Sequence, residues 1–153
     1  MLVKKTLYTA LSWDPKDPIP PFEPVVDHPQ IAIYHDGWMR PGDDGFVAET
    51  DVGALVGMAY CRQFVDGEEA YGFVDAATPE LAIGVEPEFR GQGFGQRLIQ
   101  ALHEARKAAG TKRMSLSVGA GNPARRLYER LGYREVQRRG DGVVMLADLS
   151  TRA

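Results

Sequence analysis

The residues best suited to do chemistry form a glycine-rich turn between a predicted strand and a predicted helix. The turn reads Arg90-Gly91-Gln92-Gly93-Phe94-Gly95 and follows the apolar run 80–85. Glycine has no Cβ to hold a bulky ligand away from the backbone, and the free N–H groups at a helix N-terminus attract anions. A diphosphate is therefore the ligand that the turn predicts. Plain connecting turns have a similar composition, so this motif alone does not decide the function.

Two other phosphate-binding motifs fit the turn less well. A Walker A loop would end in Gly-Lys-Ser/Thr, whereas Gly95 is followed by Gln96 and Arg97. A dinucleotide fingerprint, G-x-G-x-x-G, needs a third glycine that is absent after Gly93-Phe94-Gly95. Only one further strand–helix unit follows, which is too little for a doubly wound sheet. The sequence therefore disfavours both nucleotide-binding motifs.

A second motif lies downstream, and the two together resemble the GNAT family of N-acetyltransferases. Arg90-x-x-Gly93-x-Gly95 is similar to the family's Q/R-x-x-G-x-G/A acetyl-CoA signature. Residues 122–133, which read NPARRLYERLGY, are similar to its N-x-x-A-x-x-L-Y-x-x-x-G-F segment. One predicted helix and one predicted strand separate the motifs, in the family's order. The resemblance covers residues 46–149 and extends weakly to the helical segments before them.

The resemblance implies a binding site for acetyl-CoA as cosubstrate, without a metal. The exposed backbone of Ile83 and Val85 would pair with the pantetheine arm, and Asn122 would bind the pantetheine or the thioester end. The diphosphate would lie on the amides of the glycine-rich turn. The implied cofactor-binding residues are Ile83, Val85, Arg90, Gly91, Gln92, Gly93, Phe94, Gly95, Asn122 and Arg125. A neutral amine would attack the thioester directly, and a backbone N–H near Val85 would stabilise the oxyanion.

Two proton transfers need catalytic residues. An alkylamine with a pKa of roughly 10.4 is mostly charged at neutral pH, so a base or a water relay must deprotonate it. Glu80 is the candidate base, and its alternative is a solvated carboxylate at the end of a strand. Tyr128 matches the family tyrosine that hydrogen-bonds the CoA sulfur, and its alternative is a buried core tyrosine.

The acceptor is a small-molecule or peptide amine that the sequence does not identify. Acidic residues cluster in segments expected to flank the acceptor, which suggests a cationic amine; they are Asp36, Asp43, Asp44, Glu68, Glu69 and Asp75. Solubilising loop charges are the alternative. Trp38 and Arg40 are candidates for a wall of the acceptor site.

A non-catalytic acyl-CoA sensor or interaction module is the alternative function on the same fold. The family's sheet opens with a strand ahead of the first helix, and here that strand is missing, because the predicted helix begins almost at Met1. An open sheet edge would then be free to recruit a partner, with a homodimer as one candidate. The presence of both Glu80 and Tyr128 favours an enzyme over a sensor.

The elements that must position these residues predict an α+β fold, in which helices flank a mixed, mostly antiparallel central sheet. Helices are predicted over 2–12, 31–38, 93–109 and from Asn122, as N-cap, to Gly132. Strands are predicted over 46–50, 54–64, 71–74, 80–85, 114–118 and 143–149, with a hairpin turn at Asp51-Val52-Gly53. The proline-rich segment 15–29 is expected to be extended chain on the surface.

Composition limits the classes of function. We expect one domain over residues 1–153, because 153 residues with 44% apolar content suit one sizeable core. The net charge of -3 disfavours nucleic acid as a partner. No apolar run approaches the roughly 18 residues of a membrane span, so a cytoplasmic protein is expected. The single cysteine, Cys61, excludes an internal disulfide and is expected to be a buried strand residue.

Overall fold

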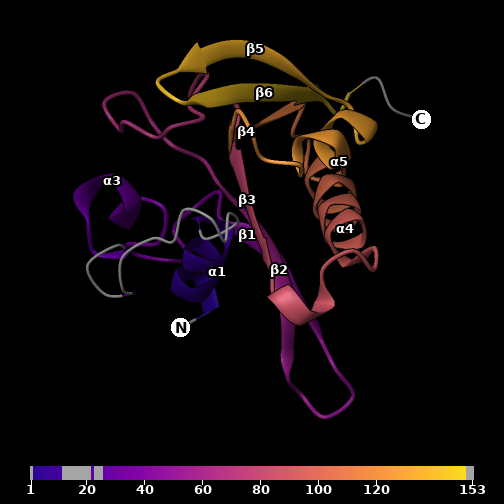
Figure 1. Cartoon of the computed structure of the whole chain (residues 1–153). Coiled ribbons are helices and arrows are strands. Elements are labelled where there is room, and N and C mark those ends of the chain that lie inside the picture. Colours follow the sequence, from indigo (N-terminus) through magenta and orange to yellow (C-terminus); the bar gives the residue numbers. More distant parts are fainter. Residues whose placement is uncertain (1, 12–21, 23–25, 151–153) are drawn as a thin grey trace.

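The computed structural model describes residues 2–11, 22 and 26–150, and its centre is a six-stranded open sheet (Figure 1). The strands lie in the order β1-β2-β3-β4-β6-β5, and only the β3/β4 pair is parallel. Their bounds are Asp44–Glu49 (β1), Leu55–Arg62 (β2), Glu80–Val85 (β3), Arg113–Gly119 (β4), Tyr133–Arg139 (β5) and Gly142–Asp148 (β6). The predicted α+β class with a mostly antiparallel sheet is confirmed. Helix α1 (Leu2–Leu11) is the first element of the described residues.

Helices cover both faces of the sheet (Figure 1). On one face lie α1 (Leu2–Leu11) and the short α3 (Pro29–Ala32), and on the other lie α4 (Phe94–Ala108) and α5 (Arg125–Arg130). Because strand side chains alternate, β2 serves two cores: Met58 and Tyr60 pack with α1, while Ala59 and Cys61 pack with α4. Helix α1 lies close on β3 because Gly84 has no side chain, since a Cβ there would stand 2.6 Å from the Thr6 carbonyl oxygen.

The predicted hairpin connects β1 and β2. Gly53 has φ +83 and its N–H donates to the Thr50 carbonyl, while Thr50 N–H donates to Ala54 O, which closes the turn. Helix α4 ends as predicted, with Gly110 at φ +95 donating to the Lys107 carbonyl. These turns follow from local sequence, and both are confirmed.

The strand predicted over 71–74 is wrong. Its backbone groups are bound by side chains rather than by a neighbouring strand: Tyr71 N–H by the Tyr34 hydroxyl and Gly72 N–H by the Glu80 carboxylate. The Gly72 carbonyl accepts from Ser115 Oγ at 2.7 Å. The segment is therefore a turn that rests on the start of β3 and β4.

Three other predictions differ from the structure. Strand β5 follows Gly132, where the sequence analysis predicted no element. The helix predicted over 31–38 is confined to α3, followed by turns through Met39, although Ile31, Tyr34 and His35 are buried. Asn122 does not cap α5 directly, because its Oδ1 accepts from Ala124 N in a turn before the helix. The segment 15–29 lies largely outside the described residues.

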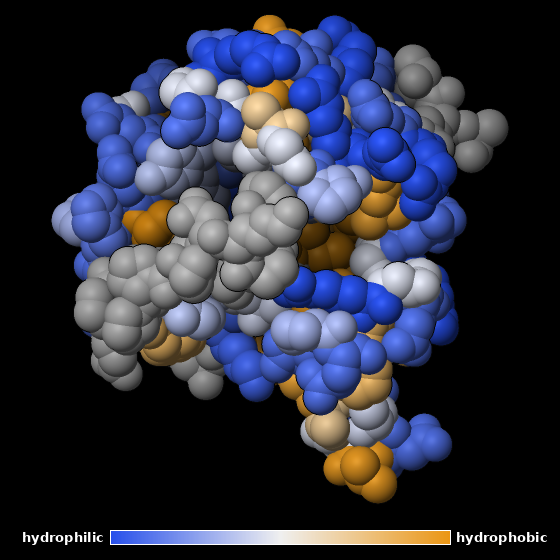
Figure 2. Space-filling view, viewed as in Figure 1, coloured by the Kyte–Doolittle hydropathy of each residue, from blue (hydrophilic) through white to orange (hydrophobic). Residues whose placement is uncertain are grey.

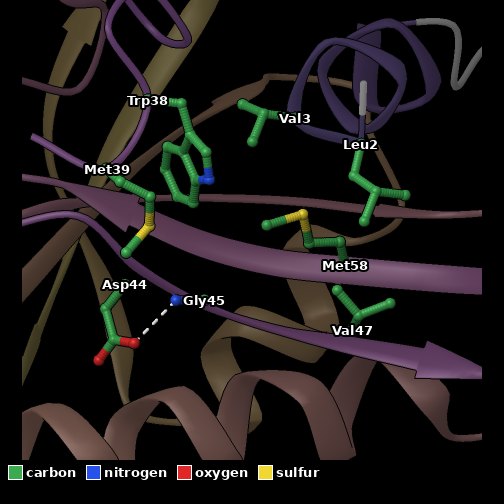
Figure 3. Close-up of a pocket in the computed structure, with 8 residues that line it drawn as sticks. All are labelled: Leu2, Val3, Trp38, Met39, Asp44, Gly45, Val47 and Met58. Carbon is green, nitrogen blue, oxygen red and sulfur yellow. Dashed lines mark hydrogen bonds between the residues drawn. The ribbon is translucent and has the colours of Figure 1, made fainter.

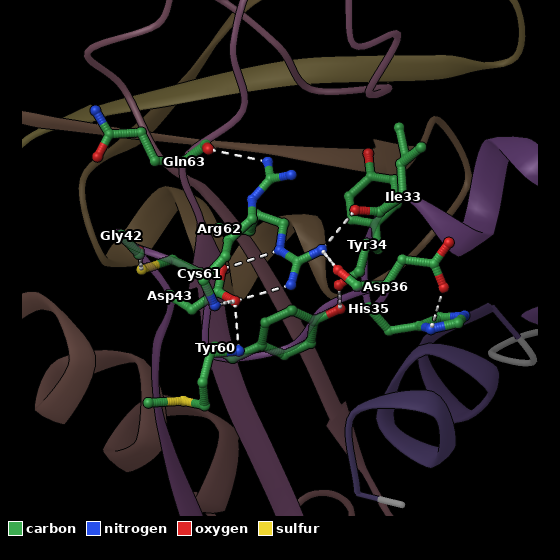
Figure 4. A network of polar contacts seen from close by, with 12 residues as sticks. Ile33, Tyr34, His35, Asp36, Gly42, Asp43, Tyr60, Cys61, Arg62 and Gln63 are labelled. Atoms are coloured by element: carbon green, nitrogen blue, oxygen red, sulfur yellow. Dashed lines mark hydrogen bonds and ion pairs between the residues drawn. The ribbon is translucent and has the colours of Figure 1, made fainter.

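A buried ion pair fixes the segment between α3 and β1 (Figure 4). Arg62 on β2 donates from Nε and Nη2 to the two carboxylate oxygens of Asp43, at 2.9 and 2.8 Å, and both side chains are buried. Its Nη1 donates to the carbonyls of Ile33 and Asp36. Every polar group of the pair is thus engaged, which a buried charge requires. The pair holds the residues on both sides of Tyr34 against the sheet.

Candidate active site

The sheet opens between β3 and β4. The two strands pair only at Glu80↔Ser115 and Leu81↔Leu116, whereas β3 pairs with β2 along its whole length. Ser115 N–H donates to Pro79 O, so every second residue from Pro79 directs its backbone groups toward β4. Ile83 and Val85 belong to this set, but the pairing with β4 has ended before them. Their N–H and C=O groups therefore face the opening.

A cavity of about 990 Å³ fills this opening, hereafter called the cleft. It is lined from one face of the sheet by Leu7, Ile31, Tyr34 and Tyr71, and from the other by Phe94, Gly95, Leu127 and Tyr128. The cleft thus has walls contributed by both faces of the sheet. Figure 2 shows apolar residues recessed behind a hydrophilic rim near the middle of the visible face.

The glycine-rich turn lies at one end of the cleft, where it begins α4. Gly91 and Gly93 have φ +76 and +88, conformations that side chains disfavour, and an added Cβ would project into open space at both. Gly93 is the N-cap, with no side-chain cap and no acidic residue in the first turn of α4. The first backbone bond of the helix runs from Arg97 N–H to Gly93 O. The N–H groups of Phe94, Gly95 and Gln96 are therefore available to an anion, and a diphosphate fits this cradle.

Arg90 crosses the strand end of the cleft. Its Nε donates to the Val85 carbonyl at 3.0 Å and its Nη2 approaches the Thr9 carbonyl at 3.5 Å. The guanidinium therefore ties the turn to β3 and α1. It also leaves a positive charge beside the helix N-terminus.

Glu80 lies at the base of the cleft, where the two strands begin to separate. Only 4% of the residue is exposed, so the solvated alternative is wrong. Oε2 accepts from the Tyr34 hydroxyl at 2.6 Å and Oε1 from Gly72 N at 3.1 Å. Burial raises the pKa of Glu80 to about 7, against these two hydrogen bonds and the nearby Arg139 charge, which favour the carboxylate. A carboxyl that titrates near neutrality in a cleft can accept a proton.

Tyr128 lines the cleft from α5. It is buried, and its ring packs edge-on against that of Tyr133 at 6.2 Å. Burial raises the pKa of Tyr128 to about 12, so its hydroxyl keeps its proton at neutral pH. Tyr128 can therefore be a buried residue and a proton donor at the same time.

The remaining predicted residues divide into two groups. Ile83, Val85, Arg90, Gly91, Gly93, Phe94, Gly95 and Asn122 line the cleft. Gln92 and Arg125 do not: Gln92 Nε2 donates to Glu88 O, and Arg125 binds Glu135 at 2.7 Å. That ion pair lowers the pKa of Glu135 and holds the Arg125 guanidinium against β5.

The sequence analysis missed several cleft residues as site residues. They include Tyr34, Tyr71, Arg130 and Arg139. The Arg139 guanidinium donates to the carbonyls of Ala70, Tyr71 and Phe73 and so anchors the turn that binds Glu80. No local motif marks Tyr34, Tyr71 or Arg139, because each reaches the cleft from an element distant in sequence, whereas Arg130 lies within the 122–133 motif.

Four of the six acidic residues expected around the acceptor are paired with arginines outside the cleft. Asp43 pairs with Arg62, Asp44 with Arg106, Glu68 with Arg40 and Asp75 with Arg113, and none of the six acidic residues lines the cleft. Trp38 lines a separate cavity of about 400 Å³ beside β1 and β2, together with Met39 and Met58 (Figure 3). The expected acidic field and the Trp38 wall are therefore absent from the cleft.

Two further searches of the described residues gave negative findings. In residues 2–11, 22 and 26–150, no three His, Cys, Asp or Glu side chains gather where they could hold a metal ion. No helix within those ranges is both long and apolar enough to cross a membrane.

The sequence is similar to those of known acetyltransferases. A mycothiol acetyltransferase from Thermobispora bispora is 33% identical over 118 residues, covering 71% of this chain and 38% of the relative. An L-methionine sulfoximine/L-methionine sulfone acetyltransferase from Pseudomonas paraeruginosa is 32% identical over 112 residues, covering 72% and 62%. The chain thus spans less than two thirds of the length of each relative.

The fold has counterparts among solved structures. The PaiA N-acetyltransferase from Thermoplasma acidophilum, solved in complex with coenzyme A, aligns with a TM-score of 0.70 over 95% of this chain and 89% of its own, at 14% identity. The model of the acetyltransferase (GNAT) family matches residues 7–133. The chain therefore belongs to the GNAT family of acetyltransferases.

Proposed function

We propose that the protein is an acetyl-CoA-dependent N-acetyltransferase that transfers an acetyl group to a primary amine. The observation that carries the proposal is the position of Glu80, a buried carboxyl with a pKa of about 7 in the same cleft as the uncapped N-terminus of α4. An anion-binding helix end and a base of this pKa in one cleft suit a phosphate-bearing acyl donor and an amine acceptor. The named acetyltransferases among its relatives support the same chemistry.

The cofactor-binding residues follow the cleft from the turn to the strand opening. The N–H groups of residues 91–95 would bind the diphosphate with the Arg90 charge beside them. The backbone of Ile83 and Val85 would pair with the pantetheine arm, and Asn122, which lines the cleft, would bind near its thioester end. On α5, Arg130 lines the cleft and Arg125 does not. Arg130 therefore replaces Arg125 as the candidate cofactor-binding arginine from this helix. When bound, acetyl-CoA supplies an activated acetyl thioester.

Glu80 acts as the base and Tyr128 as the acid. Glu80 accepts a proton from the acceptor ammonium, directly or through a water, because its carboxylate form is populated near neutral pH. Tyr128 donates a proton at the CoA sulfur from a hydroxyl that burial keeps protonated. The N–H of Val85 faces the opening and is available to an oxyanion.

Tyr34 positions Glu80 for this role. Its hydroxyl donates to Glu80 Oε2 and itself accepts from Tyr71 N–H at 2.8 Å, so both its donor and its acceptor capacity are engaged. A side chain held in this way fixes the rotamer of the carboxylate. The bond also stabilises the charged form of Glu80 against burial.

The setting of the enzyme remains a prediction in three respects. We take residues 1–153 as one acetyltransferase domain that acts in the cytoplasm, without nucleic acid or membrane. The sheet ends at β1, and a second copy of the chain is one candidate to cover that edge as a homodimer. A small-molecule or peptide amine is the acceptor.

Release of free CoA thiol tests the proposal. A panel of primary amines, both small molecules and peptides, is incubated with acetyl-CoA and the protein, and thiol is measured against amine-free controls. We expect at least one amine to raise thiol release well above the amine-free rate. Release that no amine in the panel stimulates would count against the proposal.

A further inference from the structure

Tyr71 is an exposed aromatic residue at the cleft that is nevertheless held in place. It is 41% exposed, yet its N–H donates to the Tyr34 hydroxyl at 2.8 Å, and its carbonyl accepts from Arg139 Nη1 at 3.0 Å. Its own hydroxyl donates to Gln30 Oε1 at 3.1 Å. Three separate hydrogen bonds thus fix both the backbone and the ring.

One side of the Tyr71 ring is supported by a second ring. Tyr34 lies nearly parallel to it, with centroids 6.4 Å apart and planes at 15°. An aromatic ring that is ordered before binding loses little conformational entropy when a ligand stacks on it. The exposed part of Tyr71 is therefore a preformed platform for an apolar or aromatic group.

The side chain of Tyr34 connects Tyr71, the platform, to Glu80, the proposed base. The Tyr34 hydroxyl binds both Tyr71 N–H and Glu80 Oε2, and the next residue, Gly72, donates to Glu80 Oε1. A group resting on Tyr71 thus lies beside the turn that leads directly to the carboxyl. This arrangement suits a short molecule with an apolar end and an amino end.

The neighbouring wall is apolar, and few acidic side chains line the cleft. Leu7, Leu11 and Ile31 line the cleft on the same face of the sheet as Tyr34. Among the described lining residues, the acidic side chains are Glu80 and Asp141. The Arg139 guanidinium donates to the backbone carbonyls of Ala70, Tyr71 and Phe73 and to Gln137 Oε1. Nothing in this lining offers a row of carboxylates to a polycation.

We propose that Tyr71 is a specificity-determining residue that selects acceptor amines with an aromatic substituent. The substituent stacks on the exposed part of the Tyr71 ring, and the amino group points toward Glu80. The inference rests on the proposed acetyltransferase function and specifies its substrate class.

The test compares three acceptors: phenethylamine, ethylamine and spermidine. The first two share a primary amine and differ in the aromatic ring, while spermidine is a polycation. We expect wild-type kcat/KM to be at least roughly tenfold higher for phenethylamine than for either of the others. Tyr71→Ala should lower the phenethylamine-to-ethylamine ratio by about tenfold, chiefly through KM, and Tyr71→Phe should retain most of it.

Phe46→Ala is the matched control, because Phe46 is also an exposed aromatic residue, 37% exposed on β1, and does not line the cleft. It should leave the ratio unchanged. If Tyr71→Ala unfolds, the wild-type preference and the Tyr71→Phe ratio still decide the matter. Turnover that favours spermidine or ethylamine overturns the inference while the acetyltransferase function stands. Thiol release that none of the three acceptors nor any amine in the wider panel stimulates counts against the function itself.

Discussion

The Tyr34 hydroxyl donates to Oε2 of Glu80 at 2.6 Å across 46 residues of sequence. The bond joins the turns after α3 to the first residue of β3, the strand that opens the cleft. Because it favours the charged carboxylate while burial opposes it, this contact helps to set where Glu80 titrates.

Loss of that hydrogen bond should shift the pH dependence of activity. In Tyr34→Phe the pKa of Glu80 should rise, because burial remains and a stabilising donor is gone. The rising limb of kcat/KM should move to higher pH, with activity at pH 7 down roughly three- to tenfold and partial recovery in more alkaline buffer. Tyr60→Phe is the control, since the buried hydrogen bond that it loses runs to the Tyr34 carbonyl rather than to Glu80. An equal shift in both variants would remove Tyr34 from the mechanism.

Glu80 should also make stability depend on pH. Its folded pKa of about 7 lies above the ordinary value of 4.5, so the folded state binds the proton more tightly than the unfolded state. The resulting stabilisation is complete below about pH 4.5 and is lost as pH rises through about 7. Glu80→Gln should therefore flatten the fall in Tm between pH 5.5 and 8, and should lower kcat at least roughly a hundredfold. A Tm profile that is the same in wild type and variant would show that Glu80 is not perturbed.

Tyr128→Phe separates chemistry from binding. The variant loses the proposed proton donor and keeps the ring that packs on Tyr133, so turnover should fall by roughly ten- to a thousandfold. Affinity for CoA, measured by calorimetry, should stay nearly unchanged. An unaltered rate would leave Tyr128 with a packing role alone.

Gly93 and Gly110 offer a matched pair at the two ends of α4. Both have positive φ, +88 and +95, and at both an added Cβ would meet nothing within 4 Å. Valine should therefore strain the backbone similarly at either position. Acetyl-CoA should raise the Tm of wild type and of Gly110→Val by mass action, and that shift should vanish in Gly93→Val. Normal CoA binding by Gly93→Val would mean that the cradle is misplaced.

Local sequence was sufficient to predict the turns and helix ends whose backbone conformation depends on neighbouring residues. The turn at Gly53, the C-terminal end of α4 and the Gly93 start of the same helix follow from glycine at positions of positive φ. The opening beyond Leu81 was expected from the family resemblance rather than from the residues themselves, since nothing in the β3 sequence ends the pairing with β4.

Long-range contacts account for what the sequence did not predict. Strand β5, YREVQRR, carries four charged residues and pairs only with β6 at the sheet edge, so it has no apolar alternation to reveal it. Segment 71–74 is rich in apolar residues, yet Glu80, Ser115 and Arg139 bind its backbone. Four of the six acidic residues expected around the acceptor form ion pairs with arginines distant in sequence, and such contacts have no local sequence signal.

Transfer of a labelled acetyl group is the most direct test of the central claim. The protein is incubated with isotopically labelled acetyl-CoA and an amine that stimulated thiol release in the panel. The product is analysed by mass spectrometry, and the Glu80→Gln variant is treated in the same way. The account predicts labelled amide that forms catalytically with wild type and falls to near background with Glu80→Gln. Tight CoA binding without any labelled amide would contradict it and would favour a non-catalytic acyl-CoA sensor.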